Sequence, residues 1–204
     1  MSRYLIIFSK NEVYRQVKTR LAATMGDEMA LLVYQKLLQH TCAISSVLPV
    51  HKVVYYSDYK EDKDLWDNVV YHKKVQQGED LGAKMQHAFE DAFNEGAEEV
   101  VIIGTDCLEL TSEIIMNGFA YLDQLDVVIG PAKDGGYYLL AMKAIHKELF
   151  MDIAWSTESV LAQTLDICRE KALSVHLLTE LSDIDYEKDW ENAMIIQPSM
   201  QAND

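Results

Sequence analysis

The chain has 204 residues and a formal net charge of −15 at pH 7. A chain of this length fits one domain and can bury roughly 70% of its unfolded surface, so its core needs no covalent staples. The acidic balance argues against nucleic acid as a partner, because binding to phosphate backbones depends on clustered Lys and Arg.

The cysteines and the hydropathy pattern indicate the cellular compartment in which we expect the protein. The three cysteines, Cys42, Cys107 and Cys168, are far apart and form no C-x-x-C pair, so neither a disulfide framework nor a zinc knuckle is indicated. The apolar stretch from Tyr4 to Phe8 is too short for a signal peptide, and no run approaches the length of a membrane span. We expect a cytoplasmic protein with no membrane span.

The first half of the chain is predicted to alternate between strands and helices. A strand over 3–9 is followed by a polar loop through Arg20 and a helix over 27–47. A strand over 52–57 and a loop or short helix over 62–66 come next. The weak strand expected over 69–75 carries Lys73 and Lys74, and such charges are typical of a sheet edge.

The alternation continues to the end of the chain. After a helix over 81–94, a strand over 100–103, a helix over 112–124 and a strand from 127, the tight link at Gly135 and Gly136 leads into a strand over 137–142 that can pair antiparallel. A turn at 149–150, a helix over 160–168, a strand over 174–178 and a helix over 186–194 follow. We therefore expect one α/β domain over 1–196 with a mixed, mostly parallel sheet, and a flexible tail over 197–204.

Two of the expected strands end in an aspartate. The continuous apolar runs that begin at Val100 and Val127 are typical of strands buried on both faces, and they lead to Asp106 and Asp134. In open sheets of this kind, ligands bind beyond the carboxyl ends of the strands. Both aspartates are also competent turn residues, so a purely structural role remains open.

The familiar catalytic motifs are missing from the sequence. It contains no G-x-x-x-x-G-K-[ST], no G-x-G-x-x-G after the first strand and no G-x-S-x-G, and its six histidines show no metal-ligand spacing. The candidate functional groups that remain are carboxylates and a basic segment. Residues 1–20 hold five basic side chains and one acidic one, which favours an anion site or else a solvated basic face.

These residues could bind a metal-complexed diphosphate. Mg²⁺ or Mn²⁺ usually takes one or two protein carboxylates and receives its other oxygens from phosphates and water. Asp106 is a candidate first ligand, and Asp183 or Asp185 a candidate second, although Asp185 could instead cap the last helix. The side chains that could neutralise the phosphates are Lys10, Lys18 and Arg20.

Six motifs over about residues 3–192 occur in a specific order. They are V-K-T-R-L at 17–21, G-E-D-L-G-A-K-M at 78–85, I-G-T-D-C at 103–107, G-P-A-x-D-G-G-Y-Y-L-L at 130–140, W-S-T at 155–157 and D-I-D at 183–185. In this order they resemble a bacterial family first catalogued as a domain of unknown function, DUF2064, and described as similar to GT-A glycosyltransferases or as a radical-SAM-associated transferase.

The resemblance implies a three-layer, Rossmann-like sandwich of the nucleotide-diphospho-sugar transferase (GT-A) type. It implies that Asp106 holds Mg²⁺ or Mn²⁺ together with Asp183 or Asp185, of which we choose Asp185, and we expect Asp106 and Asp134 to be catalytic. It implies phosphate contacts from Lys18 and Arg20, and we expect Lys10, Gly82 and Thr105 to contact the nucleotide or its phosphates as well. The acceptor side would be formed by Gly135, Gly136 and Trp155.

The sequence departs from the family pattern at three places. The Pro-Gly pair usual before V-K-T-R-L is absent from residues 11–16, Leu108 replaces a proline after T-D-C, and Lys84 replaces an arginine. The leading expectation is a transferase that binds a nucleoside-diphosphate sugar and passes the sugar to a small-molecule acceptor. The alternatives are a nucleotidyltransferase that couples an NTP to a phosphorylated small molecule, and a catalytically silent nucleotide-binding protein.

Overall fold

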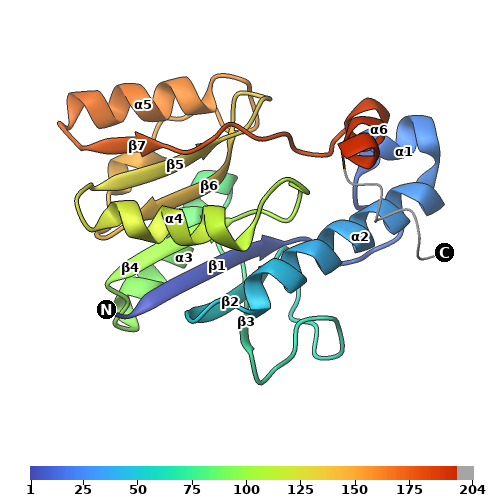
Figure 1. Cartoon of the computed structure of the whole chain (residues 1–204), viewed down its shortest axis with the longest axis horizontal. Coiled ribbons are helices and arrows are strands. Elements are labelled where there is room, and N and C mark those ends of the chain that lie inside the picture. The colour runs from blue at the N-terminus through green and yellow to red at the C-terminus, as the bar shows by residue number, and fades with distance from the viewer. Residues whose placement is uncertain (197–204) are drawn as a thin grey trace.

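Strands and helices alternate along residues 1–196, the part of the chain that the computed structural model describes (Figure 1). The strands are β1 (Arg3–Ser9), β2 (His51–Tyr56), β3 (Tyr71–Val75), β4 (Glu99–Ile103), β5 (Val127–Pro131), β6 (Tyr137–Met142) and β7 (Val175–Leu177). The helices are α1 (Thr19–Met25), α2 (Asp27–Ser46), α3 (Leu81–Asn94), α4 (Ser112–Leu122), α5 (Val160–Glu170) and α6 (Glu187–Ile196), with a 3₁₀ helix η1 (Lys147–Phe150). The tail expected over 197–204 lies outside the described residues.

The strands form one sheet in the order β3-β2-β1-β4-β6-β5-β7. Strand β1 pairs in parallel with β2 on one side and β4 on the other, so that Ile6 lies between Val53 and Ile102. Strand β6 runs antiparallel to both of its neighbours, β4 and β5, whereas β5 and β7 are parallel. The expected mixed, mostly parallel sheet is confirmed, and β3 is an edge strand as its lysines indicated.

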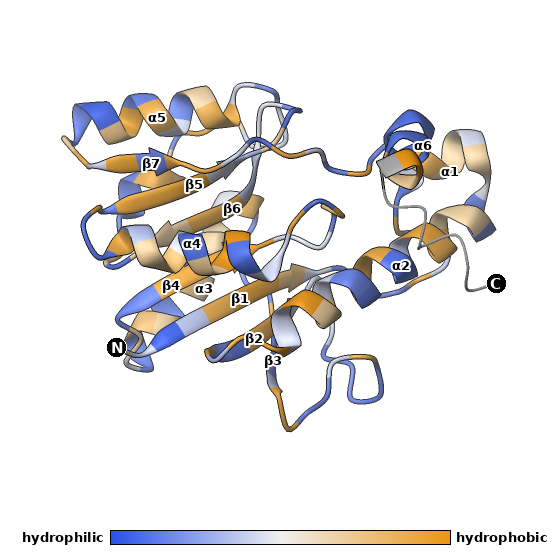
Figure 2. Ribbon diagram, viewed as in Figure 1, coloured by the Kyte–Doolittle hydropathy of each residue, from blue (hydrophilic) through white to orange (hydrophobic). Residues whose placement is uncertain are grey.

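Helices cover both faces of this sheet and give it three layers. On β1, Leu5 and Ile7 pack into the core beneath α2 and α4, while Ile6 between them packs into the core beneath α3 and α5. This alternation is the period-2 geometry of a strand, and it explains why strands buried on both faces have continuous apolar sequences. Figure 2 shows the hydrophobic strands enclosed by helices that are hydrophilic on one side.

Local sequence signals account for helix α3. Helix α3 begins where the side chain of Asp80 accepts a hydrogen bond from the backbone N–H of Ala83 at 2.8 Å, an N-cap interaction. Its apolar residues recur at helical spacing and are buried against the sheet. They include Met85, Ala88, Phe89 and Ala92.

Helix α1 was not expected, because the polar residues through Arg20 indicated a loop. Its only buried residue is Leu21, which packs with α2 and with Ala193 and Met194 of α6 (Figure 1). A seven-residue helix is marginal alone, so contacts with distant residues stabilise it rather than local propensity. The end of the N-terminal basic segment is therefore held by both α2 and α6.

Other differences from the expected elements are shifts of boundaries. Strand β3 begins two residues later than expected, β7 is shorter than the predicted 174–178, and the turn at 149–150 is part of η1. Residues 62–66 form no helix, and Trp66 at their end is fully buried. Tertiary contacts thus decide the short elements that periodicity specifies weakly.

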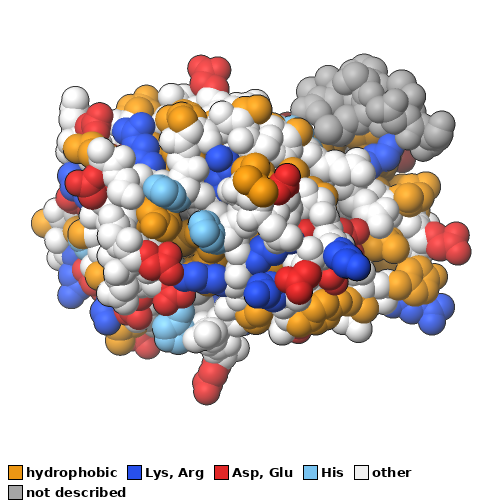
Figure 3. Space-filling model, turned by 90° about the horizontal axis from the view of Figure 1, so that it is seen from below, with side chains coloured by type: hydrophobic (Ala, Val, Ile, Leu, Met, Phe, Trp, Pro, Cys, Tyr) orange, Lys and Arg blue, Asp and Glu red, His pale blue; other side chains and the backbone are white. Residues whose placement is uncertain are grey.

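One sheet receives strands from both ends of the described chain, which supports our proposal of a single domain over 1–196. Within that range, no helix combines the length and the apolar character that crossing a membrane would demand. Figure 3 shows acidic and basic side chains intermixed on one face of the molecule.

Candidate active site

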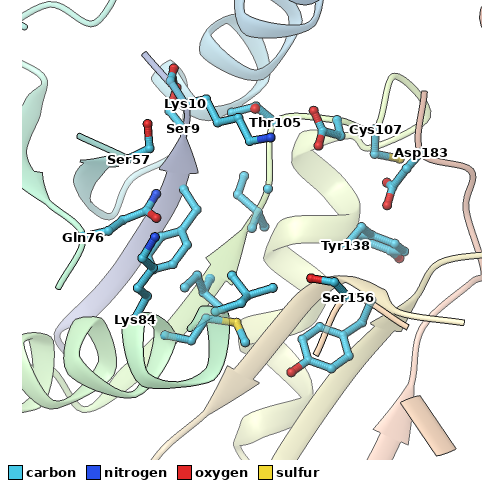
Figure 4. A pocket seen from close by; sticks show the side chains of 18 of the residues that line it. Ser9, Lys10, Ser57, Gln76, Lys84, Thr105, Cys107, Tyr138, Ser156 and Asp183 are labelled. Atoms are coloured by element: carbon cyan, nitrogen blue, oxygen red, sulfur yellow. Dashed lines mark hydrogen bonds between the residues drawn. The ribbon is translucent and has the colours of Figure 1, made fainter. Parts of the chain in front are cut away.

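A cavity of about 730 Å³ opens at the edge of the sheet where β1, β2, β3 and β4 end. Figure 4 shows Lys10 and Thr105 at the ends of β1 and β4, with Gln76 and Lys84 on one side of the cavity and Asp183 on the other. The floor is apolar, whereas the rim gathers basic and acidic side chains from four segments distant in sequence. This is the edge at which open α/β sheets bind their ligands.

Lys18 is the most buried charge of this rim. Its Nζ lies 2.7 Å from Oδ1 of Asp106 and 3.2 Å from Oδ1 of Asp185, and only 5% of its side chain is exposed. Burial alone would lower the pKa of Lys18, but the two carboxylates outweigh burial and raise that pKa. Lys18 is therefore a buried cation at neutral pH.

Asp185 is neutralised from two directions. Its second oxygen, Oδ2, accepts a hydrogen bond from Nη1 of Arg20 at 2.8 Å, so both of its oxygens face cations. It does not cap α6 through its side chain in this arrangement. Instead, the carboxylate of Asp189 accepts hydrogen bonds from the backbone N–H groups of Asp185 and Tyr186 at the start of that helix.

Asp183 has the opposite electrostatic environment. Burial, together with the nearby carboxylates of Asp106 and Asp134, raises the pKa of Asp183 to about 7, and the attraction of Lys18 offsets this only in part. The backbone N–H of Ile184 donates to the carbonyl oxygen of Asp106 at 2.9 Å and fixes this segment beside β4. The region around Asp183 therefore carries an excess of negative charge.

Hydrogen bonds with Tyr34 and Ser57 hold the residues that follow β1 in place. Oη of Tyr34 accepts a hydrogen bond from the backbone N–H of Lys10 at 2.9 Å and donates one to its carbonyl oxygen, also at 2.9 Å. Asn11 is buried, and its backbone N–H donates to Oγ of Ser57. The first two backbone N–H groups after β1 are therefore already paired within the protein.

The glycine-rich loop after β5 is held against the loop before α5. Asp134 accepts a hydrogen bond from the N–H of Gly136 at 2.8 Å, which is the turn role that its sequence allowed. Gly135 has φ of +88°, and a Cβ there would overlap the backbone of Glu158. The structure thus shows why this turn needs glycine, and it leaves one oxygen of Asp134 free of that turn contact.

Gly82 and Trp155 contact each other across two motifs. A Cβ at Gly82 would fall on the indole of Trp155, whose ring also lies edge-on to Tyr137 at 6.5 Å between centroids. In the described part of the chain, Gly82, Trp155, Gly135 and Gly136 are not among the residues that line the cavity. Trp155 lies instead against Tyr137, which does line it.

Several lining residues were given no role from the sequence, although Cys107 and Ser156 lie within two of its motifs. Ser57 and Gln76 directly follow β2 and β3, so their position after a strand was the available signal. Ser156 adopts φ of 63°, a strained conformation that no sequence pattern indicated. Cys107 also lines the cavity, but burial raises the pKa of its thiol to about 12, which leaves it protonated and unsuited as a nucleophile.

The donor set fits a hard divalent cation that also uses substrate oxygens. Within residues 1–196, no three His, Cys, Asp or Glu side chains already form a metal-binding group. Mg²⁺ needs only one or two protein carboxylates when phosphates and water supply the rest. The carboxylates around Asp183 repel one another, and a cation would remove that repulsion.

Comparisons with solved structures agree with this fold. The chain matches a protein from Desulfovibrio desulfuricans G20, described as a candidate nucleotide-diphospho-sugar transferase, with 28% identity and a TM-score of 0.87, over 100% of this chain and 90% of the other. The 4-diphosphocytidyl-2C-methyl-D-erythritol synthase of Anaerococcus prevotii matches with 13% identity and a TM-score of 0.61 over 96% of both chains.

A third match is the 2-C-methyl-D-erythritol 4-phosphate cytidylyltransferase of Thermus thermophilus. It shares 11% identity with a TM-score of 0.58, over 96% of this chain and 98% of the other, and at such identities the likeness concerns the fold. No curated protein matches the chain. Residues 37–157, more than half of the chain, match the family described as "Uncharacterized protein conserved in bacteria (DUF2064)". The chain belongs to the DUF2064 family, as its motifs indicated.

Proposed function

We propose that the protein is a metal-dependent transferase that binds a nucleoside-diphosphate sugar at the carboxyl edge of the sheet and transfers the sugar to a small-molecule acceptor. The observation that carries this proposal is the pairing of opposite charges around one cavity. Lys18 and Arg20 offer cations to a diphosphate, while Asp106 and Asp183 offer oxygen ligands to a metal ion. The likeness to the Desulfovibrio protein over the whole chain supports it.

We assign the metal to Asp106 and Asp183. The family resemblance suggested Asp185, but both oxygens of Asp185 already face cations, whereas Asp183 lies among carboxylates. A bound Mg²⁺ or Mn²⁺ would stabilise the negative charge that develops on the departing diphosphate. Lys18 and Arg20 would orient the diphosphate and neutralise part of the same charge.

We assign the acceptor side to the loop around Asp134. Its carboxylate is close enough to Asp183 to raise the pKa of that residue, so the loop faces the same charged region. Asp134 would accept the proton of an acceptor hydroxyl or orient that hydroxyl for attack on the sugar. Trp155 would support this side from its place against Gly82.

The leaving group distinguishes this proposal from nucleotidyl transfer. A sugar transferase releases a nucleoside diphosphate, whereas a nucleotidyltransferase cleaves an NTP between its α and β phosphates and releases pyrophosphate. Backbone N–H groups of a loop can cradle a triphosphate, but Lys10 and Asn11 already donate theirs to Tyr34 and Ser57. This pairing favours sugar transfer.

The first experiment identifies the nucleotide and the metal together. Wild type, Asp106→Asn and the control Asp123→Asn are screened by thermal shift against nucleotides and nucleotide sugars with and without Mn²⁺, because a specific ligand raises the melting temperature by mass action. Asp123 is exposed at the end of α4 and pairs with none of the site residues above. We expect Asp106→Asn alone to lose the Mn²⁺-dependent shift.

The second experiment assays both products with pools of acceptors. We expect acceptor-dependent release of a nucleoside diphosphate from a nucleotide sugar. Pyrophosphate release from an NTP, with no nucleoside diphosphate formed, would replace sugar transfer by nucleotidyl transfer. An unchanged Mn²⁺-dependent shift in folded Asp106→Asn would refute the metal assignment.

A further inference from the structure

Lys18 lies where its ammonium neutralises the carboxylates of the site. Its Nζ lies between Asp106 and Asp185, and its side chain is almost fully buried. Arg20, by contrast, is largely exposed; it pairs with the outer oxygen of Asp185 and lies over the ring of Tyr186. The two basic residues of the same motif therefore have different electrostatic roles in the ligand-free protein.

The backbone holds this ammonium in place. Lys18 has φ of 47° and ψ of 45°, in the left-handed region, and its carbonyl oxygen accepts the hydrogen bond from the N–H of Ala22 that begins α1. A non-glycine residue keeps such a conformation only where its surroundings enforce it. Val17 before Lys18 and Leu21 after it along the chain are both buried in the core, which holds the segment around the lysine in place.

A bare divalent cation approaching Asp106 would meet this fixed positive charge. Two like charges a few ångströms apart, in a site from which much of the water is excluded, repel each other by several times the thermal energy. A diphosphate changes the balance, because its oxygens provide Lys18 with a new acceptor and provide the metal with further ligands. Each ligand therefore removes an obstacle to the other.

We propose that Lys18 is an internal counter-ion of Asp106 that opposes binding of a bare divalent cation and makes binding of the metal and the diphosphate cooperative. This inference rests on the proposed function of the site. Thermodynamic linkage requires the coupling to be reciprocal, so the metal must also increase affinity for the diphosphate.

The test measures binding of Mn²⁺ alone by equilibrium dialysis, with free Mn²⁺ quantified by electron paramagnetic resonance. Lys18→Met keeps the aliphatic stem and removes the charge, and we expect it to bind bare Mn²⁺ about tenfold tighter than wild type or more. The same variant should bind inorganic pyrophosphate, in the presence of Mg²⁺, about tenfold more weakly. Pyrophosphate serves as the probe because it requires no knowledge of the nucleobase.

Lys73→Met is the matched control. Lys73 is also almost fully buried beside a carboxylate, with Nζ 2.7 Å from Asp64, but it belongs to β3 and is not among the lining residues described for the cavity. Its Mn²⁺ affinity should stay that of the wild type. Lys18→Arg keeps the charge and should keep the weak binding of bare Mn²⁺. If Lys18→Met does not fold, Lys18→Gln replaces it.

The possible outcomes distinguish failure of the counter-ion proposal from failure of the proposed function. Unchanged affinity for bare Mn²⁺ in a folded Lys18→Met or Lys18→Gln would overturn the counter-ion role. The counter-ion role would also be overturned if wild type bound Mn²⁺ equally tightly with and without saturating pyrophosphate, regardless of the results for the variants. Wild type that binds no Mn²⁺ even with pyrophosphate would instead refute the proposed metal-dependent function.

Discussion

Asp183→Asn should stabilise the metal-free protein at alkaline pH. The wild-type carboxylate is buried among other carboxylates, which raises its pKa from 3.8 to about 7. Between pH about 4 and about 7, the folded state therefore holds a proton that the unfolded state has lost. Stability falls as pH rises through this window, and the neutral amide removes that loss.

The structure sets the size of the effect. The difference between 3.8 and about 7 corresponds to at most about 4 kcal/mol of unfolding free energy at 1.36 kcal/mol per pH unit. Solvent in the cavity screens the charge, so we expect a gain of about 1–3 kcal/mol at pH 8. The gain should shrink at pH 5, where the folded wild type keeps the proton.

The measurement is urea unfolding of wild type and variant at both pH values with a chelator present. Asp185→Asn is the control with the opposite sign, because removing this carboxylate leaves buried Lys18 with only Asp106 as a partner. An Asp183→Asn gain that is equal at pH 5 and pH 8 would refute the proposed protonation. Loss of stability at pH 8 would refute the repulsion among the carboxylates.

Two further predictions concern the glycines. Gly82→Ala should lower stability by about 1–3 kcal/mol and change the fluorescence of Trp155, because the new methyl group overlaps its ring. Gly135→Ala should cost more than Gly26→Ala in thermal unfolding, although both have left-handed φ angles, of +88° and +84°. Only Gly135 also meets backbone, at Glu158, so equal costs would contradict the overlap.

The sequence predicted the regular elements because their periodicity is strong. Helix α3 and strands β1 and β6 have the expected bounds, since each combines an apolar pattern with a clear start. The antiparallel placement of β6 followed from the short link at Gly135 and Gly136. Helix α1 was missed, because it is short and is held by packing against α2 and against α6, about 170 residues away along the chain.

The candidate site was predicted in its residue types and only in part in its geometry. Asp106, Lys18 and Arg20 were identified, and the structure brings them together with Asp185. The choice between Asp183 and Asp185 could not be made from spacing, since it depends on which carboxylate the cations face. Likewise, the contact of Gly82 with Trp155 joins two motifs that the sequence shows as separate.

The topology explains why these charges meet. After β1 the chain passes to β2 on one side of β1, whereas after β4 it passes to β5 and β6 on the other side, so the two connections diverge along the sheet. A crevice forms at such a switch point. The C-terminal segment crosses the same edge, because Leu181 bridges to Ala132 and the N–H of Ile184 bonds to Asp106. Three segments distant in sequence therefore place their charges within a few ångströms, where Lys18 pairs with Asp106 and Asp185 and Arg20 pairs with Asp185.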